Sequence, residues 1–525
     1  GGNAGVIVNS ATLNLEGTID VSGNTFGGIE VCKSGAGTQT RAAMPAGVLN
    51  INGATIINET EVYGKPTIWI DGNTDEEGIV NGAEAFTVVE VPHGDGTQKH
   101  FYLHSYNTKP IRVGDEAYDT LAEAVAAVPT GTETTITLAP DAVIENTAVE
   151  IPAGKIIKLD LAGHKITGSG LTTRLITNKG TLTIIGDGDI YGAEGGTGII
   201  NNDGSLTIES GTFHTCEGVN GAAINNRAGG QLTVSGGIIH GSPRGIQNLG
   251  ALTINDGEFY GPNSYTASNE SNAVICATDS TATIYGGTFE GHLNGLSLMD
   301  NAGATVTIHG GTFKSDGGDG SGAIYNGLGN TLVIEDCECI TGGEAGSTVA
   351  NKGSLTINGG TFQGDNTSAQ VYTVSSGQGA SGNASLEIGP NASVTGTFGA
   401  LRVVSGTATV KGGTYTVSEA NDSTPYYALF VSSSSGKVEV TVEDGAFTSP
   451  NNAARCGETG FSTTPCTLTI TGGTFTSPAD KDAVAVANPG TVTISGGTYS
   501  SNVQDLLAEG ASIEEQGGKF VVTAG

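Results

Sequence analysis

The stretch Leu355-Thr356-Ile357-Asn358-Gly359-Gly360-Thr361-Phe362 decides the fold of this chain, because variants of it recur along most of the sequence. Further clear copies occupy 232–239, 306–313, 468–475 and 492–499, and weaker copies fill the intervals. The apolar residue that closes each copy lies 20 to 32 residues after the previous one. A repeat of this length is one supersecondary unit that cannot bury its own apolar face, so the copies must stack on one another.

Each copy of the repeat predicts three short strands. Leu355 and Ile357 alternate with Thr356, which is the two-residue period of a strand with one buried face. The Gly-Gly pair predicts a bend, and Thr-Phe a second short strand with the ring inward. A third apolar stretch precedes the copy, as in Thr348-Val349-Ala350-Asn351. Few hairpin signals occur between the copies, so each strand is expected to pair with its equivalent one coil on. The sequence predicts an all-β, right-handed parallel β-helix with three short strands per coil.

An asparagine ends the third strand in many copies, just before a glycine-containing turn. Stacked at one coil spacing, such amides can hydrogen-bond one another and the turn backbone as a ladder. We expect a structural ladder; a polar binding row is the alternative interpretation. The asparagines concerned are Asn178, Asn202, Asn226, Asn248, Asn326, Asn351 and Asn488.

The repeat pattern predicts two segments. Residues 1–109 are interpreted as the end of a first β-helix followed by a connecting region, in which 86–91 and 99–103 form a hairpin. Residues 110–525 are interpreted as the main β-helix, a monomeric rod of about fourteen coils. Thr120 and Glu123 form a capping box that predicts a short amphipathic helix near 119–128, and this helix would cover the open end of the main β-helix.

The composition excludes several classes of partner. The chain has 21 Lys and Arg against 53 Asp and Glu, and its formal net charge is −32. Such acidity argues against nucleic acid or an anionic membrane as a partner. These residues show neither a signal peptide nor a membrane span, so membrane insertion is not expected. Of the seven cysteines, Cys456 and Cys466 flank a ten-residue excursion and are the candidate pair for a disulfide.

Several motifs resemble those of a known group of proteins. The segment 113–125, with Thr120-Leu121-Ala122-Glu123 at its centre, is followed by Leu159-Asp160-Leu161-Ala162-Gly163-His164. Together with the Gly-Gly-Thr-Phe copies and Lys65-Pro66-Thr67-Ile68-Trp69, it resembles the pectate-lyase-like β-helix domains of large surface proteins from Gram-positive gut bacteria. The resemblance covers nearly the whole chain. It implies a secreted or cell-wall-attached protein with an adhesive or glycan-interacting role, and it supplies no catalytic motif.

The sequence favours binding over catalysis. β-Helix hydrolases need paired carboxylates on one outward face, and stacking the equivalent outward positions of the copies brings no two acids together. Only Arg227 and Arg244 fall in neighbouring coils as candidates for a lyase base. A polysaccharide lyase or glycoside hydrolase is the alternative, and a purely structural spacer is the second alternative.

Two acidic loops are candidates for calcium, and no other cofactor is expected. The first contains Asp71, Asn73 and Asp75 and begins like an EF-hand loop, but a glutamate and a glycine occupy its sixth and twelfth positions. The second contains Asp316 and Asp319.

The strongest candidate for ligand binding is a stripe of aromatic residues. Four consecutive copies place a ring at the same outward position, and such rings would form a platform about 15 Å long against which sugar rings pack. The alternative is cross-strand stacking that only stiffens the rod. We therefore predict an extracellular adhesin or glycan-binding stalk whose partners are glycans or another host or bacterial surface ligand. The ring positions are Tyr191, His214, His240 and Tyr260, and a neighbouring amide row comprises Asn201, Asn225 and Gln247.

Overall fold

The computed structural model describes most of the chain. The described residues are 5–24, 27–32, 46–58, 66–71, 79–84, 86–93, 96–103, 110–139, 143–193, 195–215, 221–262, 271–315, 317, 322–343, 346–366, 371–380, 384–419, 426–433, 436–459 and 464–525. They form two compact units, one of residues 1–124 with 137–143 and the other of 125–136 with 144–525. The elements α1 (Leu121–Ala127), β13 (Glu133–Leu138) and β14 (Val143–Glu145) cross the division.

The first unit contains a short parallel solenoid. Strands β1 (Val6–Val8), β4 (Ile29–Cys32) and β7 (Ile68–Asp71) pair in parallel, one coil after another. The other two sides of the coils are β2 (Thr12–Asn14), β5 (Val48–Asn50) and β8 (Val80–Asn81), and β3 (Thr18–Asp20) with β6 (Thr55–Ile57).

An antiparallel hairpin continues the first sheet of this unit. Strand β9 (Thr87–His93) pairs with β10 (Gly96–Tyr102), which in turn pairs with β7, so the predicted hairpin is confirmed. A second, smaller hairpin joins β11 (Ile111–Val113) and β12 (Glu116–Tyr118).

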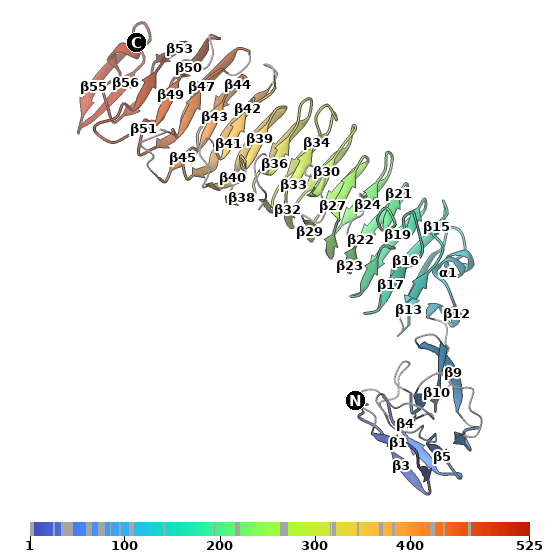
Figure 1. Cartoon of the computed structure of the whole chain (residues 1–525). Coiled ribbons are helices and arrows are strands. Elements are labelled where there is room, and N and C mark those ends of the chain that lie inside the picture. Colours follow the sequence, from blue (N-terminus) through green and yellow to red (C-terminus); the bar gives the residue numbers. More distant parts are fainter. Residues whose placement is uncertain are drawn as a thin grey trace. The chain divides into compact units, whose positions relative to one another are not determined.

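The second unit is a parallel β-solenoid with three strands in each regular coil, as predicted (Figure 1). Its 14-stranded sheet holds the third strand of each coil. These strands are β15 (Val149–Ile151), β18 (Ile176–Asn178), β21 (Ile200–Asn202), β24 (Gly221–Asn226), β27 (Pro243–Asn248), β30 (Asn272–Cys276), β33 (Asn294–Leu298), β36 (Gly322–Asn326), β39 (Val349–Asn351), β41 (Val374–Ser376), β43 (Leu401–Val403), β46 (Leu429–Val431), β49 (Ala454–Cys456) and β52 (Val484–Val486).

The Leu-Thr-Ile part of each repeat forms the first strand of a coil. These strands are β16 (Ile156–Asp160), β19 (Thr181–Ile185), β22 (Ser205–Ile208), β25 (Gln231–Val234), β28 (Ala251–Ile254), β31 (Thr281–Ile284), β34 (Thr305–Ile308), β37 (Thr331–Ile334), β40 (Ser354–Asn366), β42 (Ser385–Gly396), β44 (Gly406–Val410), β47 (Val438–Val442), β50 (Cys466–Ile470) and β53 (Gly490–Ile494). Strands β40 and β42 run on without a break through the second strand.

The Thr-Phe part of the repeat forms the second strand in the other coils. These strands are β17 (Lys165–Gly168), β20 (Asp189–Tyr191), β23 (Thr212–His214), β26 (Ile238–His240), β29 (Glu258–Gly261), β32 (Thr288–Gly291), β35 (Thr312–Ser315), β38 (Glu338–Gly343), β45 (Thr414–Val417), β48 (Ala446–Thr448), β51 (Thr474–Thr476) and β54 (Gly497–Tyr499).

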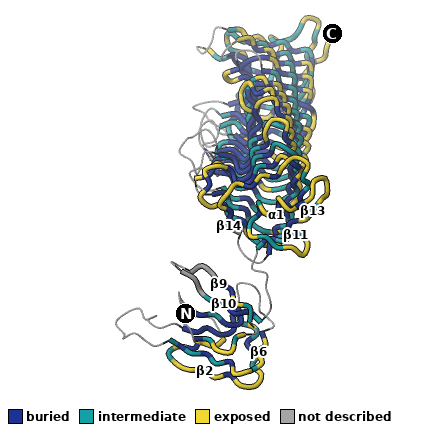
Figure 2. The backbone as a smooth tube through the Cα atoms, turned by 90° about the vertical axis from the view of Figure 1, so that its right-hand side faces the viewer, coloured by how far each residue is buried: buried dark blue, intermediate teal, exposed yellow. Residues whose placement is uncertain are grey.

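The core of the second unit consists of columns of identical or similar residues. Phe259 pairs with Phe289 and Phe289 with Phe313 in register, all three are fully buried, and their ring centroids lie 4.8 and 4.5 Å apart. Figure 2 shows the buried segments running through the coils, with exposed residues concentrated at the turns. A parallel register repeated from coil to coil forces equivalent side chains to meet, so the period of the sequence becomes the packing of the core.

The predicted asparagine ladder is present as two separate runs. Asn178, Asn202 and Asn226 each donate from Nδ2 to the Oδ1 of the next rung, ending at Asn248, with 2.8 Å between the atoms at every step. Cys276 and Leu298 then take the equivalent positions and interrupt the ladder.

The second run begins at Asn326, which donates to Asn351 over 2.8 Å, and Asn351 donates to the Ser376 hydroxyl over 2.9 Å. The inclusion of Asn488 in the ladder is wrong, because Val486 occupies the ladder register in β52.

Distinct elements flank the regular coils. In α1, which crosses the division between the units, the Thr120 hydroxyl accepts the Glu123 N–H over 3.2 Å, as predicted for the capping box. Lys155 Nζ donates to the carbonyls of Ala126 and Val128, which ties the C-terminal end of the helix to the first coil. At its end, η1 (Gln504–Leu506) leads to a hairpin of β55 (Ser512–Gln516) and β56 (Lys519–Thr523), and β56 pairs antiparallel with β54. Among the described segments, no helix has the length and hydropathy needed to cross a membrane.

Candidate functional site

The four rings predicted from the sequence form one continuous stack on the second strands. The centroids of Tyr191 and His214 lie 4.3 Å apart with 11° between the ring planes. His214 and His240 are 5.2 Å apart at 13°, and His240 and Tyr260 are 4.8 Å apart at 14°. We call these four residues the ring stripe.

This geometry changes what the ring stripe can bind. Nearly parallel rings less than 5.5 Å apart cover each other's faces, so the stack turns ring edges to the solvent. Lys165 Nζ lies 3.9 Å from the centre of the Tyr191 ring and occupies that end of the stack. The four rings therefore stack at strand spacing, as expected from the repeat, and this geometry is common to both interpretations, a sugar-binding platform and cross-strand stacking that stiffens the rod. Glycan binding to the polar ring edges stays a prediction.

Two of those edges already have acidic partners. His214 Nε2 lies 2.9 Å from Asp189 Oδ1, and the Tyr260 hydroxyl donates to Glu258 Oε2 over 2.7 Å. The hydrogen bond to Glu258, with burial, raises the pKa of Tyr260 to about 12. Burial, with the neighbouring His214, lowers the pKa of His240. Two of the four rings in the ring stripe therefore already have polar partners within the protein.

The predicted amide row lies on the outward face of the 14-stranded sheet. Asn201, Asn225 and Gln247 are in register, and Asn225 Nδ2 donates to Asn201 Oδ1 over 3.2 Å. The same register continues through Ile275, Ser297, Tyr325, Ala350, Ser375, Arg402 and Phe430.

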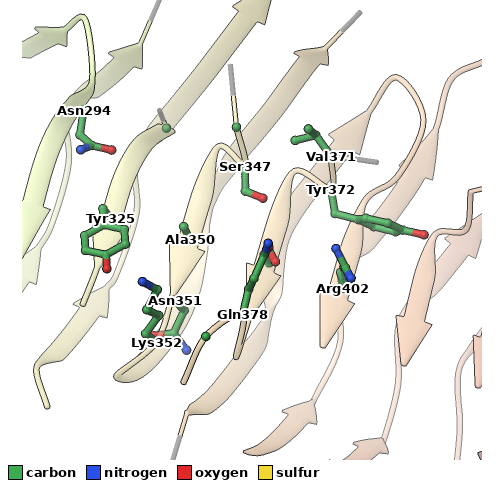
Figure 3. A pocket seen from close by; sticks show the side chains of 14 residues that line it. Asn294, Tyr325, Ser347, Ala350, Asn351, Lys352, Val371, Tyr372, Gln378 and Arg402 are labelled. Carbon is green, nitrogen blue, oxygen red and sulfur yellow. The ribbon is translucent and has the colours of Figure 1, made fainter. Parts of the chain in front are cut away.

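A groove of about 520 Å³ opens on this face, between Tyr325 and Arg402. The two residues between them in the row are Ala350 and Ser375. Figure 3 shows Tyr325, Ala350 and Arg402 on strands of the same sheet, and we call the positions of Ala350 and Ser375, with their small side chains, the floor and those of Tyr325 and Arg402 the walls. Three strand steps separate Tyr325 from Arg402, so the backbones of the two walls are about 14 Å apart. The volume lies within the ordinary range of ligand sites, roughly 300–1,000 Å³.

One wall of the groove is a hydrogen-bonded cluster. The Tyr325 hydroxyl donates to Asp300 Oδ1 over 2.8 Å, and Lys352 Nζ lies 3.8 Å from Asp300 Oδ2. Lys352 Nζ also lies 5.1 Å from the centre of the Tyr325 ring. Burial and the hydrogen bond to Asp300 raise the pKa of Tyr325, so this phenol is held in its neutral form.

The opposite wall presents polar groups whose hydrogen bonds are incomplete. Arg402 is half-buried beside Phe430, with 5.9 Å from its guanidinium carbon to the ring centre. Its Nε atom and the Oγ atom of Ser375 are both buried and have no hydrogen-bond partner among the described residues. Buried polar atoms in folded proteins are rarely left unsatisfied, so these two atoms set this wall apart from the hydrogen-bonded cluster opposite.

The remaining predicted site residues divide into two groups. The calcium candidates Asn73, Asp75, Asp316 and Asp319 lie outside the described residues, as does the side chain of Asp71. Within the described part of the chain, no three His, Cys, Asp or Glu residues gather to hold a metal ion. Cys456 and Cys466 are brought together as predicted, but as free thiols with 3.6 Å between the sulfur atoms.

The groove was not predicted from the sequence. The predicted amide row covers only three coils, and Tyr325 and Arg402, which occupy the same outward position in later coils, were not included in it. The signal was available, since two small residues between two large ones at one outward position indicate a hollow on a sheet face. It was obscured because the loops between strands differ in length, which hides the register.

Comparison of the chain with protein-family models, curated proteins and solved structures finds no match. The structure by itself shows that the fold is a parallel β-solenoid. The groove and the ring stripe are the two features that bear on function.

Proposed function

We propose that this protein is an extracellular β-solenoid that binds a glycan in the groove between Tyr325 and Arg402 and does not cleave it. The observation that carries the proposal is the groove itself. In the outward row the small residues Ala350 and Ser375 separate Tyr325 from Arg402, and polar residues line the space between them. In this proposal the protein is secreted or attached to a cell wall, and it acts as an adhesin or binding stalk related to the pectate-lyase-like surface proteins of gut bacteria.

The chemistry of the groove suits hydroxyl-rich ligands. Its lining includes the amides of Asn294 and Gln378, the hydroxyl of Ser347 and the phenol ring of Tyr325. Amides and hydroxyls can both donate and accept hydrogen bonds, as sugar hydroxyls do. An aromatic side chain adds an apolar surface with a polar tip. Parallel strands hold the floor residues Ala350 and Ser375 rigidly, which limits the conformational entropy lost when a ligand binds.

The ring stripe supports a second glycan-contacting surface. Its outward edges carry phenol and imidazole groups at strand spacing, and Glu258 and Asp189 add acceptors beside them. Because the ring faces cover each other, this surface can offer hydrogen bonds but little apolar contact, and we place it second to the groove.

A glycan array spanning mucin, plant and microbial polysaccharides tests the proposal, with the washes assayed for released oligosaccharides. Three variants locate the binding: Tyr325→Ala in the groove, the double variant Tyr191→Ala with Tyr260→Ala in the ring stripe, and Tyr285→Ala as a control. Tyr285 is 54% exposed and stacks on His309 in a different row, so its loss removes an aromatic surface without touching either candidate site.

We expect Tyr325→Ala to weaken binding about tenfold, an ordinary loss for an aromatic contact residue, while Tyr285→Ala leaves it unchanged. Loss of binding only in the double variant would move the site to the ring stripe. Released oligosaccharides would replace the proposal with a polysaccharide lyase or glycoside hydrolase. An array without any binding or release would favour a structural spacer.

A further inference from the structure

Arg402 differs from several other cations on the solenoid, because it forms no ion pair with a carboxylate within the described part of the chain. Lys179 pairs with Glu150 over 2.7 Å, Arg227 lies 3.3 Å from Asp203, and Lys411 pairs with Glu387 over 2.7 Å. Among the described residues, none provides a carboxylate in an ion pair with Arg402. Arg174, Lys155 and Arg455 also have no described carboxylate partner, but each of them donates to a backbone carbonyl. The buried Nε of Arg402 has no hydrogen-bond partner among the described residues.

The surroundings of Arg402 hold its guanidinium in place at the edge of the groove. Phe430 lies beneath it and in turn stacks on Tyr372, with 5.8 Å between the ring centroids and 18° between the planes. Ser375 precedes Arg402 in the row and is 4% exposed. An arginine fixed by stacking loses little conformational freedom on binding and presents a planar fork suited to an oxyanion.

The charges around the groove favour an anionic ligand. Lys352 and Arg402 both line the groove, and Asp300, which pairs with Lys352, offsets only one of the two positive charges. A neutral sugar would need hydroxyl partners but no excess of positive charge. The half-buried side chain of Arg402 lines the groove, and its guanidinium could donate to a bound carboxylate or sulfate.

We infer that the groove selects glycans that carry an anionic group, either the carboxylate of an acidic sugar or a sulfate ester. This inference depends on the proposed function, because it names the ligand class of the same groove. Arg402 receives the anion, and Lys352 adds a second positive charge at the other wall. The shared chemistry is a compact oxyanion on a sugar.

The test uses the full chain and sets of oligosaccharides that differ only in charge. Each set contains the neutral sugar, its carboxylated form and its sulfated form, and binding is measured at about 0.05 and 0.5 M NaCl. The variants are Arg402→Gln, which removes the charge, Arg402→Lys, which keeps the charge but not the fork, and Arg227→Gln as a control. Arg227 is paired with Asp203 outside the groove lining.

We expect the anionic forms to bind about tenfold or more tightly than the neutral forms, with the preference reduced at high salt. Arg402→Gln should remove the preference, so that the anionic and neutral forms bind this variant alike. Arg402→Lys should retain part of the preference, and Arg227→Gln all of it. The carboxylated and sulfated arms show which anion is preferred.

The two proposals fail in different ways. Equal binding of neutral and anionic forms, weakened by Tyr325→Ala, would overturn the anionic inference and leave the glycan site standing. A preference that survives in Arg402→Gln would also overturn it. If no form binds, both proposals fall. Should Arg402→Gln not fold, as judged by circular dichroism, the charge preference and salt dependence of the unaltered protein decide the matter.

Discussion

Replacing Asn226 by alanine tests whether the asparagine ladder stabilises the solenoid. Asn226 is fully buried. Its Nδ2 donates to Asn248 Oδ1 over 2.8 Å, to the Ala251 carbonyl over 2.9 Å and to the Gly230 carbonyl over 3.3 Å. Its Oδ1 accepts from Asn202 Nδ2 over 2.8 Å. The side chain therefore joins its own turn to the coils on both sides.

The expected loss follows from these four hydrogen bonds. A typical internal hydrogen bond contributes about 0.5–1.5 kcal/mol, which sets a range of roughly 2–6 kcal/mol. Two partners keep other contacts, since Asn202 Nδ2 also donates to the Gln231 carbonyl and Asn248 Oδ1 also accepts the Gly250 N–H. We therefore expect the Asn226→Ala substitution to lower the free energy of local unfolding by about 3 kcal/mol.

Amide hydrogen exchange is the suitable assay, because a solenoid opens locally and its unfolding need not be two-state. A change of about 3 kcal/mol corresponds to roughly a hundredfold faster exchange in the peptides of β24 and its two neighbours. The matched control is Asn225→Ala, on the same strand but facing outward, where one hydrogen bond to Asn201 is lost. Unchanged exchange in Asn226→Ala, or an equal effect in Asn225→Ala, would refute the structural role of the ladder.

Two further predictions concern the core and the ring stripe. Phe313→Ala removes a fully buried ring stacked 4.5 Å from Phe289, so we expect a loss of about 3–5 kcal/mol, seen as a lower urea midpoint; a loss below about 1 kcal/mol would contradict the packing. The pKa of His240 is lowered by burial and by His214, so the unfolded chain binds a proton before the native one does. Stability should therefore fall as the pH drops below about 6.5, and His240→Asn should flatten this part of the pH profile of thermal unfolding. Identical profiles for the two proteins would show that His240 does not titrate in this way.

The candidate site was only partly predictable from the sequence. The positions of Tyr191, His214, His240 and Tyr260 follow from counting along the repeat, because parallel pairing brings equivalent residues together. Whether such rings expose their faces depends on their rotamers, which the period does not specify. In the structure the rings cover each other's faces and turn their edges to the solvent.

The groove was not predicted from the sequence. Its residues Tyr325 and Arg402 nevertheless belong to the same outward row as the predicted amides Asn201, Asn225 and Gln247. Tyr325 and Arg402 are 77 residues apart and are joined in space only through Ala350 and Ser375 on the intervening strands. The ladder residues Asn326 and Asn351 mark the row at Tyr325 and Ala350, but Ser376 and Val403 take the ladder positions in the next two coils, so this mark is lost before Arg402.

The sequence by itself determined the coil of this protein: three short strands, inward columns such as Phe259, Phe289 and Phe313, and the amide ladder. Those features depend on local alternation and on a repeat that parallel pairing converts directly into contacts. Only the tertiary structure decided which surface is hollow, which rings cover each other and which charged residues line the groove. These properties arise from the sizes and rotamers of side chains on neighbouring coils, and such relations appear only when the coils are stacked.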